Sequence, residues 1–264
     1  MLNESDIKLA VIDRLFALGQ LRDAVLINEM VVANWSRRAD LVVANGKLTA
    51  FEIKSDIDTL DRLQGQVHTY SERFDKVVIV TTDRFRERAL NETNPSIGVW
   101  VARGQPGNVQ FTTARAGKAN LIKSKEMLCS FLSQSELRAL LRGKGIRVGV
   151  DANRAHLVHA VESLPVSAIR GFVLETLKGR YRDTFDAFCD VRQERTEIEN
   201  LAELSKAKRL LRGLQSAEGV QYFSKRDAFA NAVPVNFGLL EAAFGAKIEG
   251  LPAQVIPRRK PSPS

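Results

Sequence analysis

Three charged residues in the first quarter of the chain have the types and spacing of a hydrolytic metal site. Asp40 closes the segment Arg-Ala-Asp, and Glu52-Ile-Lys54 begins twelve positions later. Side chains alternate across a strand, so Glu52 and Lys54 would share one face of it. Two carboxylates suit a hard cation such as Mg²⁺ (or Mn²⁺), which neutralises phosphate charge and makes water more acidic. Lys54 could orient or help deprotonate that water.

The turn between two short apolar runs decides whether Asp40 joins the other two. Asn45-Gly46 supplies residues that accept positive φ in a tight hairpin. A two-residue turn there would set Asp40 opposite Phe51, on the wrong face. A three-residue loop with a bulge at Gly46 would set Asp40 opposite Glu52. We therefore predict the bulged turn, or a kink at Asp40.

The pattern resembles the core of the PD-(D/E)XK nuclease superfamily, which has the restriction-endonuclease-like fold. The similarity covers roughly residues 1 to 103 and rests on Asp40, Glu52-Ile-Lys54 and a helix with Gln66-X-X-X-Tyr70. More narrowly, the segments RAD and EIKSD resemble a group of little-studied bacterial proteins in that superfamily, and Gln66 and Tyr70 resemble its RecB-like exonuclease branch. Ala39 stands where proline often precedes the acid. The resemblance implies a Mg²⁺-dependent nuclease with catalytic Asp40, Glu52, Lys54, Gln66 and Tyr70.

Each of these residues also has a simpler interpretation. A Glu-X-Lys on a strand is often a solvated ion pair. Tyr70 falls on a helical apolar stripe and could be a core residue. Gln66 and Tyr70 are nevertheless about one turn apart and could reach the substrate or Lys54 together.

A third acidic ligand is expected from one of two positions. Glu29 interrupts an apolar run over residues 24–32, where a carboxylate is costly unless it is paired or binds a cation. We prefer Glu29 as this metal ligand; its alternative is a salt bridge to Arg37 or Arg38. Those arginines are expected in the loop before Asp40 and could instead grip a phosphate. Glu4 is the second candidate, because a first-helix carboxylate reaches the metal in many members of the superfamily; its alternative is a favourable position at the helix N-terminus.

The periodicity of the chain predicts an α/β sandwich around a mixed sheet, followed by an all-helical region. The domains predicted are a nuclease-like domain over 1–119, a helical domain over 120–250 and a disordered basic tail over 251–264. The elements expected are helices at 4–19, 84–90, 166–189 and 194–214, a helix with Gln66, strands at 24–32, 41–44, 48–53, 76–82 and 97–102, a hairpin within 104–117 and short helices within 220–245.

Residues 133–164 predict two amphipathic helices joined by an extended, glycine-rich link. This segment loosely resembles the SAP-type helix-extension-helix module, which implies DNA binding, although any small helical hairpin would look similar. The cations it would offer to phosphates are Arg138, Arg142, Lys144, Arg147 and Arg154.

The charge distribution suits a nucleic-acid partner. The net charge is +8, and residues 1–119 hold 16 Lys and Arg against 15 Asp and Glu, so the excess lies in the second half. A basic half beside a nearly neutral catalytic half suits a polyanion. No long apolar span or signal pattern is present, so we expect a cytoplasmic protein.

Three hypotheses follow. The first is a metal-dependent DNA nuclease in repair, recombination, phage replication or defence, for which a homodimer would be natural because a duplex has two strands to cut. The second is a catalytically inactive nuclease fold that binds DNA or a partner. The third is a structural protein whose acids form only ion pairs.

Overall fold

The computed structural model describes residues 1–32, 37–204, 233–234 and 254–255. The chain divides into two compact units, residues 1–205 and 206–264. In the second unit, β7 (Val233–Pro234) pairs antiparallel with β8 (Gln254–Val255). Most of the short helices expected at 220–245 and of the tail lie outside the described residues. The boundary expected near residue 119 lies inside the first unit.

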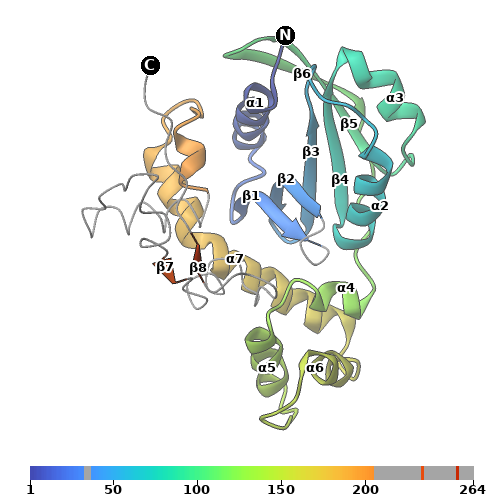
Figure 1. Ribbon diagram of the computed structural model, residues 1–264, viewed down its shortest axis with the longest axis vertical. Helices are drawn as coiled ribbons and strands as arrows, with labels where there is room; N and C mark the ends of the chain where they lie inside the picture. The colour runs from blue at the N-terminus through green and yellow to red at the C-terminus, as the bar shows by residue number, and fades with distance from the viewer. Residues whose placement is uncertain (33–36, 205–232, 235–253, 256–264) are drawn as a thin grey trace. The chain divides into compact units, whose positions relative to one another are not determined.

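The first unit contains a six-stranded mixed sheet, followed by a helical region, which confirms the predicted fold class (Figure 1). The strands lie in chain order. The β3–β4 and β4–β5 pairs are parallel and the other pairs antiparallel. The strands are β1 (Val25–Val32), β2 (Arg37–Ala44), β3 (Leu48–Lys54), β4 (Lys76–Thr82), β5 (Gly98–Gln105) and β6 (Asn108–Arg115).

Helices cover both faces of this sheet (Figure 1). The helix α1 (Glu4–Ala17) lies on one face, and α2 (Leu63–Arg73) and α3 (Arg86–Asn91), which follows the 3₁₀ helix η1 (Asp83–Phe85), lie on the other. Arg14 of α1 stacks over Trp100, which in turn packs against Phe51. Because neighbours on a strand point to opposite faces, Glu52 points toward α2.

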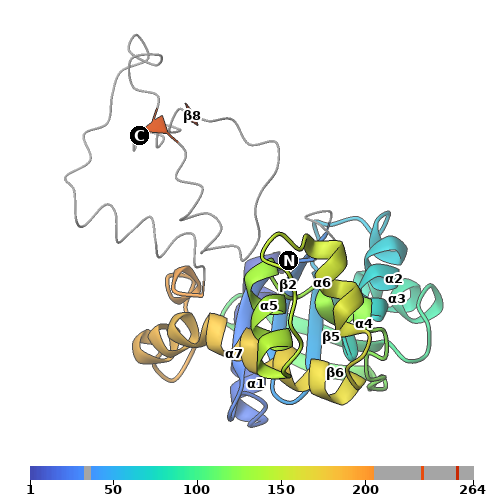
Figure 2. The same ribbon diagram turned by 90° about the horizontal axis from the view of Figure 1, so that it is seen from below.

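The helical region packs against the sheet. It comprises α4 (Lys125–Cys129), α5 (Gln134–Gly143), α6 (Arg154–Val161) and α7 (Val166–Val191). Helix α7 contacts β1 and β2, while α5 and α6 contact each other as the pair expected within 133–164 (Figure 2). Within the described part of the first unit, the last regular element is the 3₁₀ helix η2 (Asn200–Ala202).

The helix predicted over 194–214 is wrong for the part that the structure describes. Residues 194–204 contain the short 3₁₀ helix η2 and turns. The cause is Asp13 of α1, whose Oδ1 accepts hydrogen bonds from Arg192 Nη2 at 2.8 Å and from the backbone of Thr196 at 2.9 Å. These bonds draw the chain across α1 and end α7 at Val191. Residues 205–214 lie outside the described part.

Asp75, just before β4, connects the sheet to α7. Its side chain is fully buried, and its Oδ2 accepts from the backbone N–H of Leu48 at 2.7 Å. Its Oδ1 accepts from the backbone N–H of Ile122 at 3.0 Å and from Arg170 Nη1 at 2.7 Å. Arg170 Nη2 also donates to Oδ2, at 2.5 Å. Four hydrogen bonds therefore meet on one carboxylate, and loss of that carboxylate would leave all its donors unpaired.

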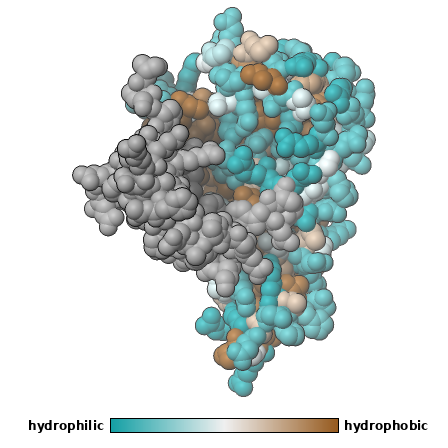
Figure 3. Space-filling view, in the orientation of Figure 1, coloured by the Kyte–Doolittle hydropathy of each residue, from teal (hydrophilic) through white to brown (hydrophobic). Residues whose placement is uncertain are grey.

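The described surface is mainly hydrophilic on the face that Figure 3 shows, with hydrophobic residues scattered over it. Among the described residues, no helix is long and apolar enough to span a membrane. In the part of the chain that the structure describes, the exposed large hydrophobic side chains are Met1, Leu18, Ile57, Leu121, Val150, Val191 and Ile198.

We expect Asp75→Ala to lower the free energy of unfolding by about 3 to 5 kcal/mol, because it leaves Arg170 charged and buried without its partner. Chemical denaturation followed by circular dichroism measures this. The control is Asp83→Ala, which breaks an exposed ion pair with Arg103 and should cost no more than about 1 kcal/mol. Equal losses in the two variants would contradict the role given to Asp75.

Candidate active site

The β2–β3 hairpin has the pairing that the bulged turn predicts. Ala44 pairs with Leu48 across a three-residue loop, and Gly46 in that loop has a φ of 95°. The ladder ends at the Leu41–Phe51 pair. At the next residue the strands part, and Asp40 Oδ2 accepts a hydrogen bond from the backbone N–H of Ile53 at 2.7 Å. The register thus brings Asp40 level with Glu52 on the neighbouring strand.

Glu52 is the centre of the cluster. Its side chain is 2% exposed, and its Oε1 lies 2.8 Å from Lys54 Nζ. Helix α2 adds two further groups, since Gln66 Nε2 donates to the same Oε1 and Tyr70 lies one turn later. The structure therefore brings the five predicted catalytic residues together, with Asp40 and Glu52 from adjacent strands and Gln66 and Tyr70 from the helix above them.

Tyr70 is a core residue, which was one of the two interpretations of it from the sequence, and its catalytic role stays a prediction. Its ring is fully buried and packs edge-on against Phe74, with centroids 5.8 Å apart. Its hydroxyl donates to the carbonyl of Arg38 at 2.7 Å. Burial, and then the charges of Glu52 and Asp40, raise the pKa of this hydroxyl. Tyr70 is therefore a neutral hydrogen-bond donor beside the acids.

The two carboxylates are held where ionisation is costly. Burial, and next the negative charge of Glu52, raise the pKa of Asp40 to about 7. Burial also raises the pKa of Glu52, and its ion pair with Lys54 opposes that rise. Glu52 Oε2 is buried and has no hydrogen-bond partner among the described residues. An unpaired carboxylate oxygen beside a second buried carboxylate fits a hard divalent cation, whose charge would favour both ionised forms.

Glu29 makes the salt bridge that was its alternative role. Its Oε2 lies 3.3 Å from Arg38 Nη1, and its Oε1 lies 3.8 Å from Lys8 Nζ, which also pairs with Glu4 at 3.0 Å. In the described part of the chain, no three acidic, histidine or cysteine residues are grouped closely enough to hold a metal ion. The third acidic ligand therefore stays a prediction, and the site as it stands has two carboxylates.

The two arginines before Asp40 lie in a different element from the one expected. Both belong to strand β2, which begins at Arg37, and not to a loop. Arg38 is 61% exposed on its side chain despite its ion pair. Arg37 lies against Gly65 of α2, where an added Cβ would be 3.1 Å from its Nη2. The binding of a substrate phosphate by Arg37 or Arg38 stays a prediction.

The basic residues of the α5–α6 pair separate into two groups. Arg138 donates to the carbonyls of Gly149, Val150 and Ala152 at 2.8, 2.7 and 2.6 Å, so it closes the link between the helices. Arg154 similarly donates to two carbonyls, those of Cys129 and Leu132. By contrast, three cations are exposed and make no side-chain hydrogen bond or ion pair with the described residues: Arg142, Lys144 and Arg147.

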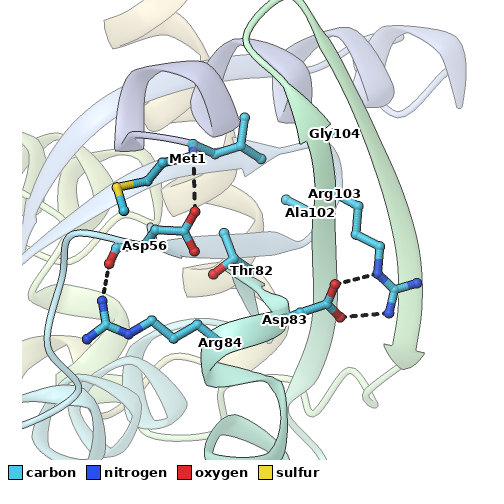
Figure 4. A pocket seen from close by; sticks show the side chains of 9 residues that line it. Met1, Asp56, Thr82, Asp83, Arg84, Ala102, Arg103 and Gly104 are labelled. Carbon is cyan, nitrogen blue, oxygen red and sulfur yellow. Dashed lines mark hydrogen bonds and ion pairs between the residues drawn. The ribbon is translucent and has the colours of Figure 1, made fainter.

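A cavity of about 320 Å³, which was not foreseen from the sequence, lies at the carboxyl ends of β4 and β5 (Figure 4). Asp56, two residues after Lys54, lines it and accepts from the backbone N–H of Leu2 at 3.1 Å. Arg103 and Asp83 form a two-bonded ion pair on its rim, with both bonds 2.7 Å long. The one available signal was that carboxyl ends of parallel strands often line ligand crevices.

Comparison with known proteins gives three similarities. The family described as "Bacteriophage P4 protein cII" matches residues 1–205. Protein cII of Enterobacteria phage P4 is 40% identical over 211 residues, which are 79% of this chain and 80% of that protein. A solved structure of a protein of unknown function from Silicibacter pomeroyi is 19% identical with a TM-score of 0.35, over 57% of this chain and 99% of its own.

The pKa of Asp40 predicts a pH dependence of stability in metal-free buffer. The folded state keeps a proton on Asp40 up to about pH 7, whereas the unfolded chain loses it near its ordinary pKa of 3.8. The folded state therefore binds more protons between these values, and the free energy of unfolding falls as the pH rises through them. Asp40→Asn removes this loss while keeping an acceptor for Ile53.

We expect the free energy of unfolding of Asp40→Asn to rise by about 2 kcal/mol relative to that of the wild type between about pH 5 and about pH 8. Urea denaturation of both proteins at the two pH values, with a chelator present, measures the difference. Asp61→Asn, at an exposed position, is the matched control and should show no such gain. If the difference in unfolding free energy between Asp40→Asn and the wild type were the same at both pH values, the raised pKa of Asp40 would be ruled out.

Proposed function

The chain belongs to the family of bacteriophage P4 protein cII, and we propose that it is a metal-dependent deoxyribonuclease that hydrolyses phosphodiester bonds. The observation that carries the proposal is the pair of carboxylates formed by the partly buried Asp40 and the buried Glu52, with Lys54 against Glu52. Oε2 of Glu52 has no hydrogen-bond partner among the described residues. Buried acids with raised pKa values beside a cation are typical of functional sites. The resemblance of the same residues to the PD-(D/E)XK pattern adds support.

In this mechanism Asp40 and Glu52 hold a Mg²⁺ or Mn²⁺ ion. Such an ion, when bound, neutralises charge that builds on the phosphate and makes a water more acidic. Lys54 would orient the attacking water and, through its positive charge, favour loss of the water's proton and stabilise the negative charge that develops on the phosphate. Gln66 holds the Glu52 carboxylate in place through its amide, and Tyr70 stays protonated beside the acids as a hydrogen-bond donor.

DNA is the proposed substrate, and the helical region is proposed to bind it. The exposed Arg142, Lys144 and Arg147 lie at the end of α5 and in the link that follows. Cationic side chains that have no partner among the described residues can contact phosphates without losing hydrogen bonds or ion pairs within the fold. Arg138 and Arg154 are excluded from this role because their guanidinium groups already bind backbone carbonyls.

A second function is favoured by one observation. Lys54 Nζ already neutralises Glu52, and the described residues supply two carboxylates rather than three. A site of this kind also fits an inactive nuclease fold that binds DNA or a partner protein. This alternative predicts salt-dependent DNA binding with no cleavage under any divalent cation.

The phage origin of the relative favours a phage-related role, in replication or defence, over general repair. Such a role would place the protein in the cytoplasm with the DNA. Cutting both strands of a duplex needs two sites, which a homodimer would supply.

We expect cleavage of DNA in the presence of Mg²⁺ or Mn²⁺, and we expect Glu52→Gln and Lys54→Met each to reduce the rate by about a hundredfold or more. The substrates are linear duplex, circular duplex and single-stranded DNA, with products resolved on gels. Survival of the circles would identify an exonuclease.

The matched controls for this assay are Glu72→Gln, at an exposed position on α2, and Lys178→Met on α7, which pairs with Glu175. Both should cleave at the wild-type rate. If the protein bound DNA but did not cleave it with either metal, the nuclease hypothesis would be wrong and the inactive, DNA-binding fold would be supported.

We expect the triple variant Arg142→Ala, Lys144→Ala and Arg147→Ala to bind DNA more weakly and with a shallower salt dependence. Each lost phosphate contact should reduce the slope of log affinity against log salt by about 0.9. Fluorescence anisotropy between about 50 mM and about 200 mM salt measures the slope. Arg86→Ala with Arg88→Ala, on exposed residues of α3, is the control, and an equal effect there would contradict a specific role for the α5 end.

A further inference from the structure

Lys8 is a buried cation that the proposed mechanism does not use. It lies on α1 with a side chain that is 6% exposed, and its Nζ is 3.0 Å from Glu4 and 3.8 Å from Glu29. A buried ammonium is costly unless it is paired, so this pairing is strongly constrained. Its charge also acts on the site, because burial raises the pKa of Asp40 and the charge of Lys8 partly offsets that rise.

Glu29 is one of the two acids that pair with this cation. The pairing of β1 with β2 places Glu29 level with Asp40. The pairing of β2 with β3 places Asp40 level with Glu52. The three acids thus form one row across three adjacent strands, and in regular strands their carboxylates would point to one face. A site with three carboxylates is what the bare register would give.

The backbone at Glu29 breaks this row. Its φ is 57°, in the left-handed region that non-glycine residues rarely adopt within a strand. Such strain persists only where the surroundings fix it, and here the carboxylate binds Lys8 Nζ on one oxygen and Arg38 Nη1 on the other. Within the described residues no three potential ligands are grouped, as expected if Glu29 is turned away.

We propose that Lys8 is a positioning residue that holds Glu29 away from the Asp40–Glu52 pair, so that a divalent cation is bound by two carboxylates and not three. Mg²⁺ in phosphate-handling sites is usually bound by one or two carboxylates together with substrate oxygens and water. Withholding the third acid leaves those positions open to the phosphate. The inference rests on the proposed function for the presence of the cation.

The test is isothermal titration calorimetry with Mn²⁺ alone, on the full chain. We expect Lys8→Met to bind Mn²⁺ about tenfold more tightly, because Glu29 becomes free to join the two carboxylates as a third ligand. Glu29→Gln should bind as the wild type does, within about twofold. The double variant should lose the gain, since the added ligand is then missing. A lost charge alone would keep the gain in the double variant, so this cycle separates positioning from simple electrostatics.

The matched control is Lys178→Met, which removes another lysine paired with a glutamate on a helix and should leave Mn²⁺ binding unchanged. Should Lys8→Met fail to fold by circular dichroism, Glu29→Gln alone still decides, because weakened Mn²⁺ binding in that variant would make Glu29 a ligand and overturn the proposal. An unchanged affinity in folded Lys8→Met, or a gain that persists in the double variant, would also overturn it while leaving the nuclease intact. No Mn²⁺ binding by either the wild type or Lys8→Met would refute the metal site and the role of Lys8 together.

Discussion

The first unit depends on one buried carboxylate. Asp75 receives the backbone N–H of Leu48 at the start of β3, the backbone N–H of Ile122 before α4 and the guanidinium of Arg170 on α7. A carboxylate with no exposed surface is stable in this position because each of its oxygens is paired. The place where β3 begins fixes its register against β4, in which Glu52 stands beside Ile79. The candidate site thus inherits its geometry from an ion pair that takes no part in it.

At the site itself the opposing requirements are burial and charge. Glu52 and Asp40 are enclosed by the sheet and by α2, which excludes water and raises the cost of ionisation. The protein supplies fixed cations next to the acids, Lys54 beside Glu52 and Lys8 beside Glu29. Of the acids at this edge, Glu52 and Glu29 are thus paired with cations inside the fold, and Asp40 is held by the backbone N–H of Ile53.

Much of this arrangement could be predicted from the sequence because it depends on local rules. Alternation along β3 placed Glu52 and Lys54 on one face, and the bulged turn at Gly46 placed Asp40 beside them. The pairing of Glu29 with Arg38 was also foreseen as an alternative. The involvement of Lys8 was not, because the contact joins α1 to β1 across the fold and no spacing rule links those positions. The helix expected from residue 194 was wrong for the same reason, since Asp13 pairs with Arg192 from 179 positions away.

The ion pair between Asp75 and Arg170 has a consequence for synthesis of the chain. Its partners are 95 residues apart, so the sheet is translated in full before the arginine that completes it. While only the first 119 residues have emerged, Asp75 has neither Arg170 nor the Ile122 amide as a partner. Because burying an unpaired carboxylate is costly, Asp75 should stay hydrated at that stage. The nascent sheet should therefore remain loosely closed on the ribosome until α7 follows. The edge of the sheet that carries the candidate site would then be assembled late, when the helical region is already present.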